Sequence, residues 1–180
     1  PPSFLQPFPT FTHKKIQLVM QYRRFGKSNF NVSEIGYGMW GLAGWTGGDQ
    51  NEVARALDRS VDLGVNFFDT AWGYGAGKSE QILGDLLRQH RDKRLYFATK
   101  IPPMNFKWPS RPEFQLKDVF PAHHIIEYTE KSLKNLRVEQ IDLQQFHVWN
   151  DAWHDHDEWK SAIEKLTREG KVAHWGVSVN

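Results

Sequence analysis

Two kinds of hydrophobic pattern alternate along most of this chain. Apolar residues recur at helical spacing in four segments, which predict helices at residues 51–63, 79–89, 122–136 and 157–169. Runs rich in β-branched and aromatic residues lie before and between them, and predict strands at residues 35–40, 65–69, 95–100, 141–147 and 172–177. A hairpin is predicted ahead of these elements at residues 22–35, with turn chemistry from Gly26 to Asn29.

Small polar residues and glycines predict where the helices begin and end. Asp49 or Asn51 can cap the first helix, and Ser79 is the candidate N-cap of the second. Gly64 and Gly170 follow the last periodic residues of the first and fourth helices, so we expect each of these helices to stop there.

Three further segments are expected to lie outside the sheet and its core. Residues 101–121 hold five prolines, which predict a long loop. The Gly-rich residues 41–48 are expected to form a loop at the rim, because no G-x-G-x-x-G pattern follows a strand here. His123 and His124 open the third helix, and we expect them at the surface.

Strands that alternate with helices of this length indicate a parallel sheet. Polar residues mark the strand ends at Asp69, Lys100, His147 and Ser178, with separations of 31, 47 and 31 residues. An eight-unit barrel of about 250 residues repeats about every 31 residues. The spacing therefore favours a (β/α)8 barrel, and an open doubly wound sheet is the alternative.

Five strands do not close an eight-stranded barrel. We therefore expect residues 20–180 to be the N-terminal part of a longer barrel, or the product of a truncated reading frame. Residues 1–19 are rich in Pro and Phe without periodicity, and we expect a disordered extension.

Composition narrows the class of protein. The 23 basic and 21 acidic residues give a net charge of +2, which offers no electrostatic case for binding nucleic acid. No apolar run approaches the roughly 20 residues that cross a bilayer. The chain has no cysteine, so thiolate chemistry and disulfides are excluded for it. We expect a cytoplasmic protein without membrane contact, and the sequence makes no prediction of its oligomeric state.

The strongest candidate chemistry follows the second predicted strand. That strand ends at Asp69, and Tyr74 follows between two glycines, where the backbone can turn sharply. In a parallel barrel, Asp69, Tyr74, Lys100 and His147 would share one rim.

A phenol is a poor acid at neutral pH, and a nearby ammonium favours its ionised form. A carboxylate would balance the buried lysine, and an imidazole can donate a hydrogen bond to a carbonyl oxygen. These four side chains together predict a general acid site, in which the phenol protonates an oxygen as negative charge develops on that oxygen.

The chain resembles the aldo-keto reductase superfamily from about residue 22 to its end. The resemblance rests on residues 64–75 (GVNFFDTAWGYG), 98–100 (ATK), 142–147 (DLQQFH) and 176–178 (GVS). It implies a (β/α)8 barrel that reduces an aldehyde or ketone to an alcohol with NADP(H). It also implies that Tyr74 donates the proton and that Lys100 and Asp69 set the pKa of Tyr74. His147 would orient the carbonyl.

The same resemblance implies a set of cofactor-binding residues. Gly38, Met39, Trp40 and Asp69 would lie near the nicotinamide ribose, and Ser178 and Asn180 would hold the carboxamide. Many family members have Ser-Asn adjacent, whereas Val179 intervenes here. The residues that grip the adenosine phosphates in the family come from later strands.

Two other function classes compete with the reductase. The His/Asp-rich stretch at residues 147–157 could serve a metal-dependent hydrolase, although its spacing fits no metal motif and we predict no metal ligand. The other competing class is a reductase-like subunit or inactive fragment without turnover.

The tryptophans fall into two groups. Trp40, Trp45, Trp72 and Trp149 are expected near the rim, and Trp153, Trp159 and Trp175 are expected to pack inside or at an interface.

In the family, the residues that hold the adenosine phosphates come from strands that follow the five predicted here, and this gives a first prediction. The 180-residue chain should bind NADPH weakly or not at all, which a titration followed by tryptophan fluorescence would measure. Micromolar affinity of this chain would contradict it.

Overall fold

Five parallel strands form the main sheet of the protein. The structure is a computed structural model that describes residues 19–44 and 49–179. The strands are β3 (Tyr37–Gly38), β4 (Phe67–Asp69), β5 (Tyr96–Ile101), β6 (Ile141–Phe146) and β7 (Val172–Val177). Each strand pairs in parallel with the next one along the chain. All five predicted strands are therefore confirmed, the first two in shortened form.

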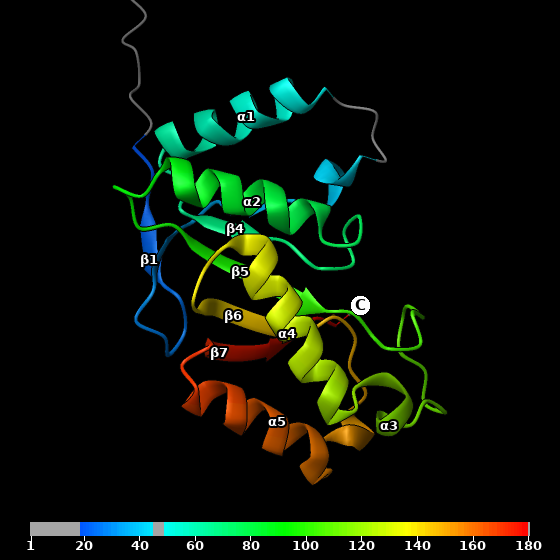
Figure 1. Ribbon diagram of the computed structural model, residues 1–180. Coiled ribbons are helices and arrows are strands. Elements are labelled where there is room, and N and C mark those ends of the chain that lie inside the picture. Colours follow the sequence, from blue (N-terminus) through cyan, green and yellow to red (C-terminus); the bar gives the residue numbers. More distant parts are fainter. Residues whose placement is uncertain (1–18, 45–48, 180) are drawn as a thin grey trace, which may run out of the picture.

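One or two helices separate each strand of the parallel sheet from the next. They are η1 (Trp40–Ala43), α1 (Gln50–Asp62), α2 (Lys78–Gln89), α3 (Leu116–Val119), α4 (Ala122–Leu136), η2 (Asp151–Trp153) and α5 (Asp157–Arg168). Figure 1 shows α1, α2, α4 and α5 covering the same face of the sheet. A doubly wound sheet carries helices on both faces, so sequential order and one covered face indicate consecutive units of a (β/α)8 barrel.

A two-stranded hairpin covers the amino ends of the parallel strands. It consists of β1 (Tyr22–Arg24) and β2 (Asn31–Ser33), as predicted. The ring of Phe30 lies 4.7 Å from that of Tyr96 and 4.9 Å from that of His174, centroid to centroid. Figure 1 shows the hairpin at one end of the sheet and the C-terminus at the other, so the hairpin leaves the carboxyl ends uncovered.

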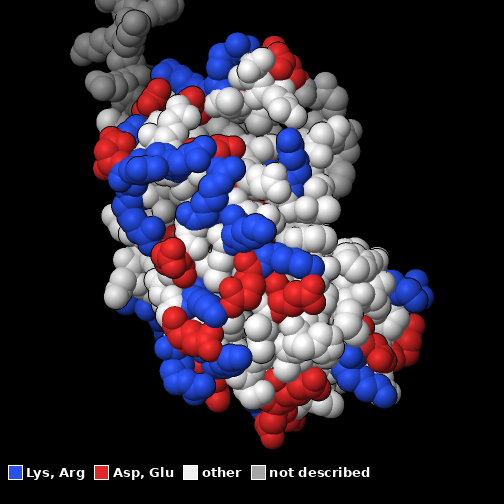
Figure 2. Space-filling view, in the orientation of Figure 1, with Lys and Arg blue, Asp and Glu red and all other residues white. Residues whose placement is uncertain are grey.

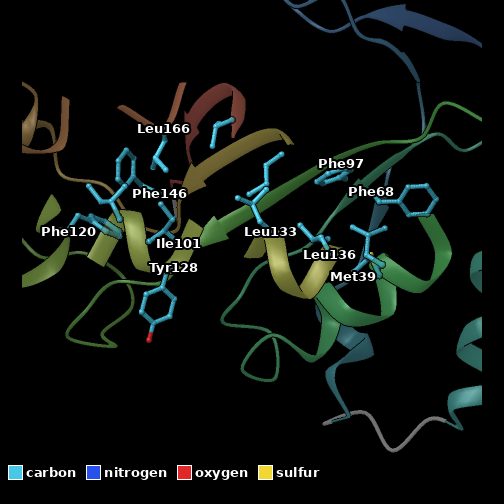
Figure 3. Packing of buried hydrophobic residues seen from close by; sticks show 14 of the residues in the cluster. Met39, Phe68, Phe97, Ile101, Phe120, Tyr128, Leu133, Leu136, Phe146 and Leu166 are labelled. Carbon is cyan, nitrogen blue, oxygen red and sulfur yellow. The ribbon is translucent and has the colours of Figure 1, made fainter. Parts of the chain in front are cut away.

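The hydrophobic core lies between the sheet and its helices (Figure 3). Phe68 and Ile101 contribute fully buried side chains to it. Because side chains alternate across a strand, their neighbours Asp69 and Lys100 point to the opposite face. Packing against the helices therefore determines which polar residues turn toward the inside of the barrel.

A buried carboxylate fixes the start of α2 against the sheet and α4. Glu80 is fully buried and accepts hydrogen bonds from Thr99 Oγ1 at 2.6 Å and Asn135 Nδ2 at 2.8 Å. Desolvation raises the pKa of Glu80, against the opposing effect of these hydrogen bonds. Thr99 precedes Lys100, so this contact helps to hold the strand that carries the lysine.

The structure corrects two predictions about helix starts. Gly77, with φ +88°, is the N-cap of α2, and Ser79 lies buried inside the helix. The Ser79 hydroxyl donates to the carbonyl of Met39 at 3.1 Å and accepts from Thr70 Oγ1 at 2.7 Å. His124 was wrongly expected at the surface: it is buried and its Nε2 lies 2.7 Å from the carbonyl of Pro102.

The start of α1 agrees with the sequence prediction, and the predicted loop at residues 101–121 needs a small change. Asp49 caps α1 by accepting from the backbone N–H of Asn51 at 2.9 Å. Within the predicted loop at 101–121, residues 116–119 form the short helix α3. The expectations for residues 1–18, Trp45 and Asn180 fall outside the described residues.

The helical face carries charges of both signs. Figure 2 shows Lys and Arg side chains gathered over the middle of this face with acidic side chains beside them. Arg88 and Arg137 both pair with Asp85, and Lys131 pairs with Glu127. Carboxylates therefore neutralise part of the positive charge. Within the described segments, no helix is long and apolar enough to cross a membrane.

The contact between α2 and α4 yields a stability prediction. A Cβ at Gly84 would lie 2.7 Å from the Leu136 carbonyl oxygen and 2.8 Å from that of Asn135. Both are backbone atoms, so Gly84→Ala should force the helices apart and cost about 1–3 kcal/mol, despite the roughly 1 kcal/mol that alanine gains in a helix. Urea denaturation measures this, with the exposed Gln81→Ala on the same helix as control. Equal stability of Gly84→Ala and wild type would contradict the close approach.

Candidate active site

The chain stays hydrogen-bonded to neighbouring strands just beyond the strand ends. The backbone bonds are Met39 N–H to Asp69 O (2.8 Å), Trp72 N–H to Lys100 O (3.2 Å), His147 N–H to Ile101 O (3.1 Å) and Ser178 N–H to Phe146 O (2.8 Å). They extend the parallel ladder into the rim. The predicted strand-end residues Asp69, Lys100 and His147 are therefore held in register at one edge of the sheet.

Lys100 is the centre of this edge. Its side chain is only 5% exposed, and its Nζ lies 2.8 Å from each carboxylate oxygen of Asp69. The same ammonium donates to the carbonyl of Thr70 at 2.9 Å and lies 3.3 Å from the Tyr74 hydroxyl. A buried ammonium needs such partners, because desolvation of an unpaired charge is costly.

A tight turn after β4 aims Tyr74 at the lysine. Gly75, Ala76 and Gly77 all have positive φ, so the backbone turns back on itself directly after the tyrosine. The N–H of Gly77 donates to the carbonyl of Trp72 at 2.7 Å and closes the turn. A Cβ on Gly75 would lie 2.9 Å from that of Ala43, so a side chain there would push the turn away from η1.

His147 packs edge-to-face against the ring of Tyr74. Their ring centroids are 5.5 Å apart and the ring planes meet at 77°. Burial lowers the pKa of His147 to about 4, and the positive charge of Lys100 adds to the effect. The imidazole is therefore neutral at physiological pH and can act as a hydrogen-bond donor without carrying charge.

The surroundings of His147 also select its tautomer. Nδ1 is buried and has no hydrogen-bond partner in the part of the chain that the structure describes. A buried donor without an acceptor costs more than an unused nitrogen lone pair, so we infer that Nε2 carries the proton. The neutral ring can then donate from Nε2.

The predicted cofactor residues do not all face this site. The side chain of Met39 is fully buried in the core, so only its backbone remains near the rim. Gly38 ends β3 and Trp40 is exposed at the start of η1. Ser178 borders a cavity of about 220 Å³, together with Trp149 and Asp151.

The alternative metal site is not supported by the geometry. In residues 19–44 and 49–179, no three His, Asp or Glu side chains converge as metal ligands. His154, Asp155 and His156 are exposed in the loop before α5. Another cavity, of about 230 Å³, lies between α1 and α2, and none of the four predicted catalytic residues lines it.

Comparison with known proteins assigns the family. The sequence model of the Aldo/keto reductase family matches residues 34–180. The chain belongs to this family.

Individual relatives agree with this assignment. The uncharacterized oxidoreductase YqkF of Bacillus subtilis (strain 168) is 34% identical over 88% of this chain and 49% of its own length. A probable voltage-gated potassium channel subunit beta of Arabidopsis thaliana is also 34% identical, over 88% of this chain and 46% of its own length. The solved aldo-keto reductase AKR11C1 from Bacillus halodurans (holo form) is 30% identical with a TM-score of 0.71, over 89% of this chain and 50% of that one. The chain thus spans about half the length of these relatives.

Two groups that contact the candidate site residues were missed from the sequence. The carbonyl of Thr70 accepts from Lys100, but any residue type supplies a carbonyl. Trp108 lies in the proline-rich loop, and its ring centroid is 5.5 Å from that of His147. That loop has no periodic pattern, so only tertiary structure reveals the contact.

The lowered pKa of His147 predicts a pH dependence of stability. Its ordinary value is 6.5 and its folded value is about 4, so the unfolded chain takes up the proton first as pH falls. Wild type should therefore lose on the order of 2 kcal/mol more than His147→Asn between pH 7 and pH 4. Urea denaturation across this range measures the difference.

The exposed His154→Asn is the matched control for this experiment, and its pH profile should follow that of wild type. If wild type and His147→Asn lose stability in parallel, His147 is not held neutral by the fold.

Proposed function

We propose that the protein reduces aldehydes or ketones to alcohols with NADP(H), and that Tyr74 is the proton donor. Family membership supports oxidoreductase activity on carbonyl compounds. The observation that carries the proposal is the Lys100 ammonium, which contacts both oxygens of Asp69 and the hydroxyl of Tyr74. This arrangement places a fixed positive charge beside the only phenol that also faces His147 among the described residues.

The groups around the site suit a nicotinamide and its ribose. The Asp69 side chain remains 40% exposed although it pairs with Lys100, so its oxygens can also accept from sugar hydroxyls. Ser178 offers a hydroxyl at the border of a cavity, and the open space beside Gly38 leaves room for a ligand. We assign Gly38, Trp40, Asp69 and Ser178 to this binding site, with Met39 contributing backbone only and Asn180 as the further carboxamide contact. When bound, the dinucleotide supplies the hydride.

The protein's own residues then manage the proton and the charge. The carbonyl oxygen of the substrate accepts hydrogen bonds from the Tyr74 hydroxyl and from His147 Nε2. As negative charge develops on that oxygen, the O–H bond of Tyr74 breaks and the new O–H bond of the alcohol forms. The phenolate left on Tyr74 is stabilised by the Lys100 ammonium, which is already in place and needs no reorganisation.

A non-catalytic role is the second candidate. One relative is described as a probable voltage-gated potassium channel subunit beta, a name that does not mention catalysis. This chain retains a tyrosine, lysine, aspartate and histidine in contact, which favours turnover. The chain spans about half the length of these relatives, and the proposal is made for the protein as a whole.

Substitution of the phenol tests the proposal. In the full-length protein, Tyr74→Phe should lower kcat/KM for 4-nitrobenzaldehyde with NADPH about 10²–10⁴-fold, because positioned proton transfer contributes that much. Tyr96→Phe, at the other end of the strand that carries Lys100, should stay close to wild type. The loss of reduced-nicotinamide absorbance as NADPH is oxidised gives the rates.

Two outcomes would reject this mechanism. Full activity of Tyr74→Phe would exclude the phenol as donor. Activity that is lost with a chelator or in His154→Ala would instead favour metal chemistry in the loop before α5.

A further inference from the structure

A buried carboxylate lies on the helical side of the sheet, behind the rim, and takes no part in the proton transfer described above. Glu80 belongs to the first turn of α2 and is fully buried. Its Oε1 accepts from Thr99 Oγ1 at 2.6 Å, and its Oε2 accepts from Asn135 Nδ2 at 2.8 Å. Each carboxylate oxygen is therefore bonded to a different element, one to β5 and the other to α4.

The burial of this carboxylate is costly. Its two hydrogen-bond partners are a hydroxyl and an amide, and neither carries a positive charge. Desolvation raises the pKa of Glu80, and the hydrogen bonds oppose this effect. Ionisable groups in such surroundings are frequent at functional sites, so a role beyond packing is indicated for Glu80.

The bond between Glu80 and Thr99 joins the two segments that carry the proton donor and the ammonium. The N–H of Ser79, the residue before Glu80, donates to the carbonyl of Tyr74 at 3.2 Å. Thr99 is the residue before Lys100 in β5. One side-chain hydrogen bond thus connects the helix turn that holds the tyrosine to the strand that carries the lysine.

Asn135 supports the same turn from α4. Its Nδ2, which donates to Glu80, packs so closely on Gly77 that a Cβ at Gly77 would overlap it. The N–H of Gly77 closes the turn by donating to the carbonyl of Trp72 at 2.7 Å. The amide that Glu80 orients therefore presses on the end of the turn that aims Tyr74.

The contact between Lys100 and Tyr74 needs such support. Lys100 Nζ lies 2.8 Å from each carboxylate oxygen of Asp69 and 2.9 Å from the carbonyl of Thr70. Its distance to the Tyr74 hydroxyl is 3.3 Å, which is longer than the usual length of about 2.7–3.2 Å. The ammonium is held tightly from β4, so the surrounding backbone, rather than this long contact, sets the separation from the phenol.

We propose that Glu80 is a positioning residue, which holds the Tyr74 hydroxyl and the Lys100 ammonium at their reactive separation. The inference rests on the proposed carbonyl reduction. Glu80 acts through Thr99 on the strand and through Asn135 on the turn, and these two hydrogen bonds are its strand arm and its turn arm. A carboxylate suits this role because both of its oxygens accept, so it can receive two donors at once.

The separation matters because the attraction between the ammonium and the phenolate that forms decreases with distance. At an effective dielectric constant of about 20, an increase of about 1 Å weakens this attraction enough to slow the reaction about 5- to 10-fold. Neither Thr99 nor Asn135 belongs to the cofactor-binding residues assigned above. Loss of one arm should therefore slow the reaction and leave the binding of NADPH unchanged.

The test removes the arms of Glu80 in the whole protein. Thr99→Val and Asn135→Leu keep the size of the side chain and remove its donor. Each should lower kcat/KM for 4-nitrobenzaldehyde about 5- to 10-fold, with the dissociation constant of NADPH within about twofold of wild type. Glu80→Leu fills the same space and removes both arms, so its kcat/KM should fall at least as far. A thermal unfolding scan of each variant establishes that it is folded.

Two comparisons separate positioning from general damage. Thr129→Val is the matched control, because this buried hydroxyl donates to the carbonyl of Ile125 within α4, and its kcat/KM should match wild type. Thr99→Val should cause almost no further loss in the Tyr74→Phe background, since the phenol through which it acts is already gone. An equal loss in both backgrounds would overturn the proposal.

Crystal structures of the variants give a measurement that does not depend on turnover. The distance from Lys100 Nζ to Tyr74 Oη should grow by about 1 Å in Thr99→Val and Asn135→Leu, the increase on which the expected rate loss is based, and stay at the wild-type value in Thr129→Val. If wild type reduces no carbonyl compound but the distance grows in both variants, the proposed function fails and the positioning role stands. If the distance is that of wild type in both variants, the positioning role is overturned.

Discussion

The ammonium of Lys100 is the constraint on which this site depends. Its side chain is almost fully buried, and a charge in that position is tolerated only when its hydrogen bonds are made. Asp69 and the carbonyl of Thr70 satisfy it from β4 and the residue that follows. These contacts fix the strand ends relative to each other, and the remaining direction of the ammonium is toward the hydroxyl of Tyr74. The need to pair a buried charge and the placement of the proposed proton donor are thus met by one arrangement.

The rest of the fold holds this arrangement from three sides. On the helical side of β5, Thr99 donates to the buried Glu80 of α2, directly beside the lysine in sequence. At the amino ends, the β1–β2 hairpin closes the sheet with aromatic contacts, including Phe25 stacked on Phe67 at 5.2 Å. At the carboxyl ends, the Tyr74 turn is held on α2 through Ser79 N–H, which donates to the Tyr74 carbonyl. Reactive groups are therefore confined to one rim, where an α/β barrel places its chemistry.

The fold and the meeting of Asp69, Tyr74, Lys100 and His147 could be predicted from the sequence for a physical reason. Strand and helix periodicity locate the elements, and parallel strands bring their carboxyl ends together, so polar residues such as Asp69 and Lys100 had to meet. The failures have a common cause as well. Ser79 resembles an N-cap, and His124 resembles a surface residue, but tertiary partners bury both. Met39 shows that a rim position in sequence does not determine which way its side chain points. Trp108 lies in a loop without periodicity, so its contact with His147 appears only in three dimensions.

A double-mutant cycle between Lys100 and Tyr74 tests the central claim most directly. The account holds that the ammonium acts on the reaction through the phenol, so the two residues form one functional unit. We measure kcat/KM of the full-length protein for wild type, Lys100→Met, Tyr74→Phe and the double variant. The account predicts that the double variant is about as slow as the slower single variant, because the second substitution removes a group whose partner is already gone. If the two losses multiply, the lysine and the tyrosine act independently and the account is contradicted.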